Sequence, residues 1–180
     1  MTDKKIIEHT INWIKNIVID LNFCPFAGKA LLKKSIRYVV LPKTTAKKCL
    51  EALSAELKFL DVNNDFETAF IIIPANFKSF DTYLSLVEKA EEFISENNYD
   101  GMYQLASFHP KYCFAGSTNT DAANYTNRSP YPMLHILRED SVTKALAHFP
   151  NPEKIPERNI DLAREKGLRY MQLLRAACMQ

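Results

Sequence analysis

The chain has 180 residues with nearly balanced charge, since 23 basic and 21 acidic side chains leave a net charge of +2. This balance argues against a general nucleic-acid or membrane binder, because such proteins concentrate basic residues on one face. The apolar share of 47% and the charged share of 24% are those of an ordinary globular protein. A chain of this length can bury a substantial core, so we expect residues 1–180 to form a single globular domain.

The cysteines and the N-terminus indicate the cellular compartment. The four cysteines at positions 24, 49, 113 and 178 include no C-x-x-C pair, so neither a disulfide framework nor a zinc ribbon is indicated. Charges interrupt the apolar residues at the N-terminus, which argues against a signal peptide. No apolar run approaches the roughly 20 residues that a membrane helix needs. We therefore expect a cytoplasmic protein with free thiols and no membrane partner.

The first part of the chain predicts a helix followed by a sharp turn. Apolar residues recur at three- and four-residue steps over about residues 4–21, as in an amphipathic helix that buries one broad face. Pro25 disfavours helical geometry at Cys24 and has no backbone N–H to donate. Cys24 is therefore expected on irregular backbone just past the end of a helix.

The rest of the chain alternates between strand and helix patterns. The expected strands cover residues 35–42, 68–74 and 102–108, with a short fourth strand at 133–137. The expected helices begin at Thr44 or Thr45, at Ser79 or Asp81, and after Ser141, and a last helix runs from about Glu157 to Cys178. This order predicts an α/β layered domain with three or four mostly parallel strands, joined by right-handed crossovers, and helices on both faces.

A long loop follows the third strand. From about Pro110 to about Tyr131 no helical or strand period is present, and connections beyond about 12–15 residues are uncommon in compact domains unless they are functional or disordered. The aromatic residues in this segment argue against disorder. Open α/β sheets bind ligands at the carboxyl ends of their strands, and His109 leaves the third strand at such an end. We therefore predict a ligand pocket formed by the 107–135 loop and the Cys24 turn.

Three motifs carry a resemblance to a known family. The segments N-F-C-P-F-A, Q-L-A-S-F-H-P-x-Y-x-F-A-G and N-Y-T-N-R-S-P-Y-P-M-L-H-x-L-R-E resemble a bacterial family catalogued only as a domain of unknown function. The resemblance extends over nearly the whole chain and implies no particular activity. It marks a set of positions that does not include Cys113, because the family does not usually have cysteine there. The marked residues are Cys24, Pro25, His109, Pro110, Asn124, Asn127, Arg128, Ser129, Pro130 and His135.

Three of these residues are candidates for catalysis. His109 and His135 flank the loop, and histidine titrates near pH 6.5, which suits proton transfer. Cys24 is a candidate nucleophile if its thiol is activated, although the negative end of a helix dipole would disfavour the thiolate. The alternative for each histidine is a hydrogen-bonded structural residue, and the alternative for Cys24 is a small buried side chain that packs the turn.

Four residues of the loop are candidates for ligand binding. Arg128 offers a planar fork of donors that fits phosphate or carboxylate, and Asn124, Asn127 and Ser129 can add polar contacts. The alternative is that Arg128 pins the loop, with Asp121 as its partner. Both interpretations remain open from the sequence.

Together these features predict an enzyme that acts on a small polar or anionic substrate, with Cys24, His109, Arg128 and His135 around one shared hollow. The alternatives are a non-catalytic module that binds a small ligand in the same pocket, a protein whose loop binds a macromolecule, and a metal-binding protein. In the last case Cys24, His109, Cys113 and His135 would bind zinc, but no closely spaced pair anchors such a site. No metal, cofactor or nucleic-acid partner is predicted.

Overall fold

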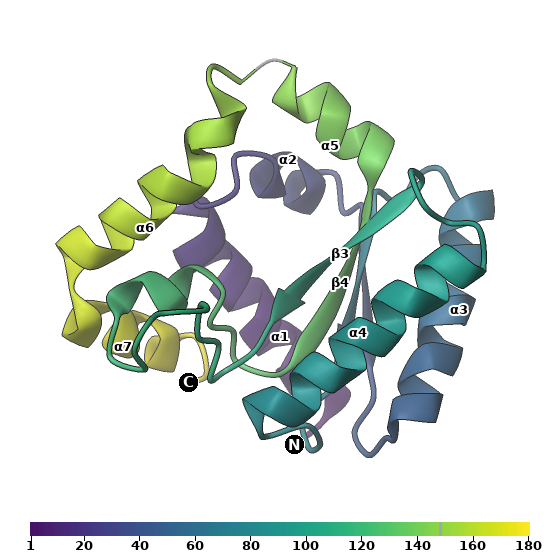
Figure 1. The fold of residues 1–180 in the computed structure, drawn as a ribbon, viewed down its shortest axis with the longest axis horizontal. Coiled ribbons are helices and arrows are strands. Elements are labelled where there is room, and N and C mark those ends of the chain that lie inside the picture. The colour runs from purple at the N-terminus through teal and green to yellow at the C-terminus, as the bar shows by residue number, and fades with distance from the viewer. Residues whose placement is uncertain (148) are drawn as a thin grey trace.

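A computed structural model of the chain describes residues 1–147 and 149–180. Within these residues four strands form one sheet with helices on both faces (Figure 1). The strands are β1 (Ile36–Val40), β2 (Thr68–Ile72), β3 (Tyr103–Phe108) and β4 (Met133–Arg138). The helices are α1 (Asp3–Trp13), η1 (Ile14–Ile19), α2 (Ala27–Leu32), α3 (Ala46–Val62), α4 (Phe80–Glu96), η2 (Ala122–Thr126), α5 (Glu139–Leu146), η3 (Pro152–Lys154), α6 (Ile155–Lys166) and α7 (Leu168–Ala177).

The sheet is mixed, with the strand order β1-β2-β4-β3. β1 pairs with β2 in parallel, whereas β4 is antiparallel to both β2 and β3. The three strands expected before the loop therefore run in one direction, and β4 returns between two of them. The expectation of mostly parallel strands is therefore matched only in part, because β4 takes a central position and makes the pairings on both of its sides antiparallel. With six residues β4 is also no shorter than the other strands, although a short strand was expected.

Two separate apolar clusters lie on the two faces of the sheet. Helices α3 and α4 cover one face, where Leu53, Leu57 and Tyr83 are fully buried against Ile71 and Ile73. The other face packs against the N-terminal helix α1 with η1 and against the C-terminal helices α6 and α7. This second cluster includes Trp13, Ile17, Phe23, Phe70, Ile72, Tyr125, Met133, Ala163 and Met171. The layered arrangement with helices on both faces is therefore confirmed (Figure 1).

The first helix occurs where the sequence predicts it, but its second half has π geometry. Thr2 caps α1 by accepting from the backbone N–H of Lys5. In η1 the backbone bonds lengthen to five-residue steps, as from Asp20 N–H to the carbonyl of Lys15 at 3.0 Å. Such π segments often lie at functional sites. The turn expected at Cys24 is present, and it leads into the short helix α2, which the sequence pattern did not predict.

The last expected helix is divided in two. Gly167 has φ of 81°, a left-handed value that ends α6 and begins α7. Glycine adopts this value without steric cost, which is why the break falls there. In the part of the chain described here, no helix is long and apolar enough to cross a membrane.

The 107–135 loop is an ordered part of the domain. Asp121 begins the 3-10 helix η2 by accepting from the backbone N–H of Ala123, a short helix in a segment where none was expected. Helix α6 packs along η2, as the side-by-side ribbons show (Figure 1). The loop is therefore held between β3, β4 and the C-terminal helices.

Candidate functional site

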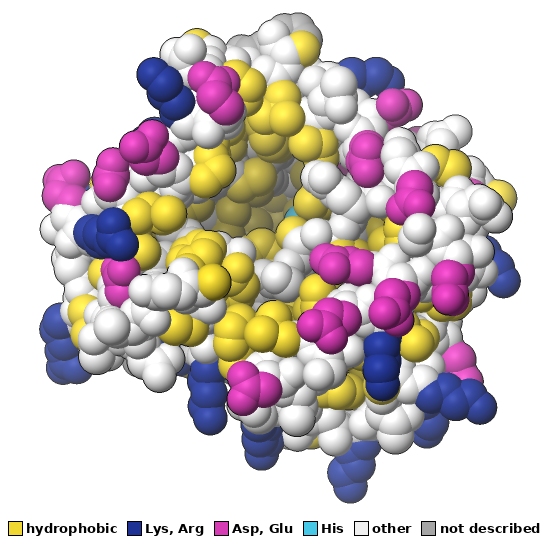
Figure 2. Space-filling view, in the orientation of Figure 1, with side chains coloured by type: hydrophobic (Ala, Val, Ile, Leu, Met, Phe, Trp, Pro, Cys, Tyr) yellow, Lys and Arg dark blue, Asp and Glu magenta, His cyan; other side chains and the backbone are white. Residues whose placement is uncertain are grey.

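A deep hollow opens on the face of the molecule shown in Figure 2. Its inner surface is hydrophobic, with charged side chains gathered mainly outside it, and a histidine side chain is visible in its wall. In the same orientation the hollow lies among α6, α5 and the strands β3 and β4, with α2 behind it (Figure 1). We call it the sheet hollow, because β3 and β4 border it (Figure 1). Phe70, His135 and Phe108 project from the face of the sheet on this side, where α2 and α6 pack.

A row of stacked rings crosses this face of the sheet. Tyr38 on β1, Phe70 on β2 and His135 on β4 are register partners, so their side chains project from the same face. The Tyr38 and Phe70 ring centroids are 6.0 Å apart with planes within 8°. The Phe70 and His135 centroids are 3.8 Å apart with planes within 6°. The next register partner is Ala106 on β3, which has no ring to continue the row.

Two further aromatic residues stand beside the row. The Phe108 ring is tilted by 41° to His135 at a centroid distance of 6.0 Å. Trp13 on α1, which is 1% exposed, contacts Phe108 edge-on at 5.0 Å. Because Trp13 is the only tryptophan of the sequence, its fluorescence reports on this part of the core.

The hydrogen bonds of His135 define its tautomer. The hydroxyl of Thr68 donates to the carbonyl of Ile136 at 2.5 Å, so it has no proton left for His135. The 2.5 Å contact between Thr68 Oγ1 and His135 Nε2 is therefore donated by Nε2–H. Nδ1 has no hydrogen-bond partner among the described residues and is not among the fully buried unpaired atoms, so its lone pair is unpaired and retains some contact with solvent.

The surroundings of His135 keep its ring neutral. Burial lowers its pKa from 6.5 to about 3, because the apolar site disfavours the imidazolium. At neutral pH the open Nδ1 is therefore a hydrogen-bond acceptor, not a positive charge. Its low basicity makes His135 a weak general base.

Cys24 lies on the same side of the sheet as His135. It is half-buried, and it packs against the cluster that contains Phe70. Asn159 on α6 fixes this turn by donating from Nδ2 to the carbonyl of Phe23 at 2.7 Å. Burial raises the pKa of the Cys24 thiol, and this effect exceeds the opposing one of nearby backbone N–H groups. The thiol therefore remains protonated at neutral pH and is a poor nucleophile.

His109 lies on the other side of the sheet, next to α4. Its ring is 0% exposed and contacts Phe80 and Tyr83. Nε2 is 2.9 Å from the carbonyl of Phe77, to which it donates, and Nδ1 accepts from the backbone N–H of Lys111 at 3.0 Å. Both ring nitrogens are thus occupied, as expected of a histidine that holds the start of the loop in place.

Arg128 is buried within the loop, with 7% of its surface exposed. Its Nε donates to the carbonyl of Tyr112 at 2.9 Å, and its Nη2 donates to the carbonyl of Asn119 at 3.0 Å. The guanidinium also lies 4.9 Å from the centroid of the Tyr125 ring. These contacts pin the two sides of the loop together. Asp121 takes no part in this, although the sequence suggested it as the partner.

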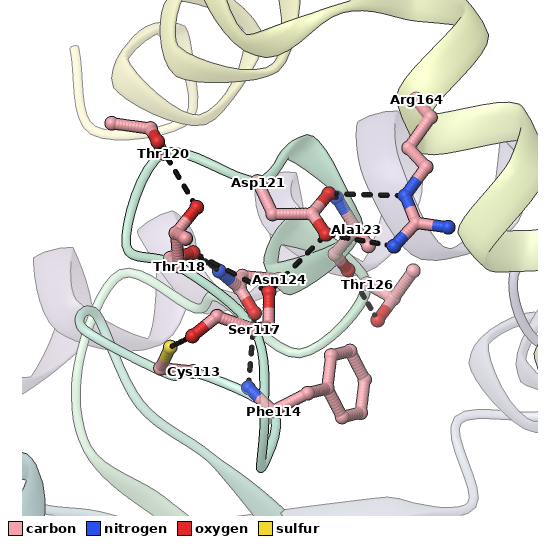
Figure 3. Close-up of polar contacts among 10 residues, drawn as sticks. All are labelled: Cys113, Phe114, Ser117, Thr118, Thr120, Asp121, Ala123, Asn124, Thr126 and Arg164. Atoms are coloured by element: carbon pink, nitrogen blue, oxygen red, sulfur yellow. Dashed lines mark hydrogen bonds and ion pairs between the residues drawn. The ribbon is translucent and has the colours of Figure 1, made fainter.

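The other three candidate ligand-binding residues also hold the loop together. Asn124 is 0% exposed, accepts from the backbone N–H of Phe114 at 3.0 Å and donates to the carbonyl of Thr118 at 2.8 Å (Figure 3). Asn127 Oδ1 accepts from Thr126 Oγ1 at 2.9 Å. Ser129 donates to the carbonyl of Tyr131 at 2.5 Å.

Asp121 joins the loop to α6. Its carboxylate accepts two bonds from Arg164, at 2.8 Å from Nη2 and 3.2 Å from Nε, and a third from Ser117 at 3.2 Å (Figure 3). These donors hold the pKa of the Asp121 carboxyl well below its usual range. The ion pair fixes α6, one wall of the sheet hollow, relative to the loop.

The four groups expected around one hollow are therefore divided. Cys24 and His135 share one side of the sheet, His109 lies on the α4 side, and Arg128 is enclosed by the loop. Among residues 1–147 and 149–180, no three histidine, cysteine or acidic side chains are grouped so that they could hold a metal ion.

Two open pockets lie away from the sheet hollow. One, of about 590 Å³, lies between α3 and α4 and is lined by residues that include Leu50, Lys89 and Phe93. The other, of about 410 Å³, lies at the start of α3 and is lined by residues that include Lys43 and Asn76. They provide alternative locations against which binding at the sheet hollow can be tested.

The family of this chain is identified by a family model that matches most of its residues. The model of the family described as "Protein of unknown function (DUF1415)" matches residues 5–173. The chain belongs to this family. Neither a curated protein nor a solved structure matches it. The matched range of this DUF1415 chain includes the Cys24 turn, the 107–135 loop and all four strands.

Sequence reasoning missed Tyr38, Phe70, Ala106 and Phe108, which lie beneath or beside the sheet hollow. Phe70 lay in an apolar run that indicates a strand covered on both faces, so nothing distinguished it from core residues. The signal that could have found the row was the central position of Tyr38 and Phe70 in two strands expected to pair. Their alignment with His135, however, depends on the register between β2 and β4, which cannot be read from the sequence.

Proposed function

We propose that this protein binds a small, mainly apolar molecule in the sheet hollow, where the molecule donates a hydrogen bond to Nδ1 of His135. The observation that carries the proposal is a ring nitrogen with an open lone pair in an otherwise apolar concave site. Ligand sites commonly combine apolar walls with a few polar groups that fix orientation. Thr68 supports this role, because it fixes the tautomer that leaves Nδ1 unprotonated.

Binding is favoured over catalysis by the protonation states of the two candidate reactive groups. Burial raises the pKa of the Cys24 thiol and lowers that of His135 to about 3. An enzyme that used them as nucleophile and base would need the opposite shifts. The anionic substrate suggested by Arg128 also fits the hollow less well, because the two loop carbonyls already engage that guanidinium.

Binding can be tested with N-phenyl-1-naphthylamine, an uncharged fluorescent probe that has one N–H donor. We expect saturable binding at one site, with increased probe fluorescence and a change in the emission of Trp13. The variant His135→Phe keeps a ring against Phe70 but has no acceptor. Because a hydrogen bond contributes about 0.5–1.5 kcal/mol, this variant should bind the probe roughly 2- to 12-fold more weakly.

The control is Leu50→Glu, which places a charge in the pocket between α3 and α4. This variant should bind the probe as the wild type does. Loss of binding in Leu50→Glu with no change in His135→Phe would place the probe on the other side of the sheet and contradict the proposal. Absence of saturable binding by the wild type would contradict it as well.

A further inference from the structure

The ring row ends beside an open position. Tyr38, Phe70 and His135 place one ring on each of β1, β2 and β4, and register continues to Ala106 on the edge strand β3. Adjacent strands lie about 4.8 Å apart, which brings rings on neighbouring strands close to stacking distance. Ala106 contributes only a methyl group and is half-buried. The β3 side chain at this register therefore leaves room for a ring beside His135.

The second face of the imidazole is available for such a ring. Phe70 covers one face of His135 at 3.8 Å. Phe108 approaches at 6.0 Å but is tilted by 41°, so it flanks the imidazole and does not stack on it. His135 is half-buried, which agrees with one covered face and one open face.

The two contacts that His135 offers point in different directions. A stacking partner lies above the plane of the imidazole, whereas the lone pair on Nδ1 lies within that plane. A flat, rigid molecule that stacks on His135 cannot place a donor attached directly to its ring in line with this lone pair. A donor on a short flexible arm can reach past the edge of the imidazole.

We infer that the ligand of the sheet hollow has a planar, uncharged aromatic ring that stacks on His135 over Ala106, and a hydroxyl or N–H donor on a short flexible arm that reaches Nδ1. This inference rests on the proposed function and specifies the chemical class of its ligand. The ring continues the row from Phe70 and His135, and Phe108 contacts its edge. An ionised group at this position would lose water without gaining a partner from the apolar walls.

Three related probes test the two parts of this inference by displacement of N-phenyl-1-naphthylamine. 2-(2-Naphthyl)ethanol has the ring and the arm, its decahydro analogue has the arm on a puckered skeleton, and 2-naphthol has the ring with a rigid donor. We expect 2-(2-naphthyl)ethanol to bind at least about threefold more tightly than either of the others, a factor consistent with one stacking contact or one hydrogen bond. Equal affinities for all three would overturn the inference.

Substitutions at Ala106 test the location. Ala106→Phe fills the open position with a ring of the protein and should weaken 2-(2-naphthyl)ethanol at least about tenfold. Ala106→Ser keeps the position open and should change the affinity less than about twofold. Unchanged affinity in a folded Ala106→Phe variant would overturn the inference.

A measurement on the wild type does not depend on whether variants fold. With ¹³C-labelled histidine and alanine, we expect intermolecular nuclear Overhauser effects from the naphthyl protons to the His135 ring and the Ala106 methyl group. The absence of nuclear Overhauser effects to both residues would overturn the inference.

The experiments distinguish failure of this inference from failure of the proposed function. Equal displacement by the planar and puckered probes would contradict the inferred ligand class but leave the proposed binding site intact. Failure of N-phenyl-1-naphthylamine itself to bind would contradict the proposed function too.

Discussion

The imidazole of His135 lies face to face with the phenyl ring of Phe70, with centroids 3.8 Å apart and planes within 6°. The two residues are register partners on the adjacent strands β4 and β2, so the backbone pairing itself imposes the contact. This apolar neighbour contributes to the burial that keeps His135 neutral, and it directs the other face of the imidazole away from β2. The chemistry of the site therefore depends on the register of two antiparallel strands.

Stability should decrease as His135 becomes protonated. The unfolded chain binds this proton near pH 6.5, whereas the folded chain binds it only near pH 3, so acid favours unfolding throughout that interval. The stabilisation is complete above pH 6.5 and is lost as the pH falls towards 3. Between about pH 6 and pH 4, the free energy of unfolding of the wild type should fall more steeply than that of His135→Phe, by up to about 1.4 kcal/mol per pH unit. Urea unfolding at several pH values measures this difference. Equal slopes would contradict the assigned pKa.

Cys24 should react slowly with iodoacetamide at neutral pH. Burial raises the pKa of its thiol, and the thiolate is the reactive form. We expect Cys24 in the folded protein to be alkylated at least about tenfold more slowly than in the unfolded chain, as followed by mass spectrometry of the peptide that contains it. Alkylation in the native protein as fast as in denaturant would restore Cys24 as a candidate nucleophile.

Asn124→Ala should destabilise the fold. The fully buried amide satisfies the N–H of Phe114 and the carbonyl of Thr118, and its removal leaves both backbone groups without that partner (Figure 3). Each buried unpaired group costs roughly 1–3 kcal/mol, so the loss of both partners should lower the free energy of unfolding by about 2–6 kcal/mol. The control is Thr120→Ala in the same loop, which removes an exposed contact with Thr118 and should change little. Equal effects of the two substitutions would contradict this role of Asn124.

Asp121 should contribute more to stability than its partner Arg164. Asp121→Ala removes both the cap of η2 and the ion pair to α6, and loss of a cap alone costs about 0.5–2 kcal/mol. Arg164→Ala removes only the ion pair, whose guanidinium is exposed to water and therefore contributes less. Asp121→Asn, which keeps the cap, should resemble Arg164→Ala. Chemical unfolding of the three variants measures this order, and a larger loss in Arg164→Ala than in Asp121→Ala would contradict it.

Much of the secondary structure could be predicted because it depends on local patterns. The helical spacing of apolar residues over 4–21 and the cap at Thr45 correspond to α1 with η1 and to α3. The short helix α2 was missed, since it has only six residues and Pro25 precedes it closely. The position of β4 between β2 and β3 could not be read from the sequence, because strand order depends on pairing partners far apart in the chain.

In the candidate site, too, some features could be predicted from the sequence and others depended on tertiary contacts. The loop was correctly expected to be ordered, and Arg128 was one of its recognisable residues, but the choice between pinning the loop and binding an anion depended on which carbonyls lay nearby. Those of Tyr112 and Asn119 are 16 and 9 residues away in sequence, and they engage the guanidinium. For His109, Nδ1 accepts from the nearby N–H of Lys111, but the carbonyl of Phe77 that occupies Nε2 lies 32 residues away in sequence.

The sequence by itself determined the order of the strands and of the longer helices, the layered α/β class and the turn at Cys24, because hydrophobic periodicity and proline act over a few residues. Only the tertiary structure decided that Tyr38, Phe70 and His135 form one row and that Ala106 leaves its end open. The physical reason is strand register: a shift of one residue would turn the side chains of a strand to the opposite face. That register is fixed by backbone hydrogen bonds between strands that lie far apart in the sequence.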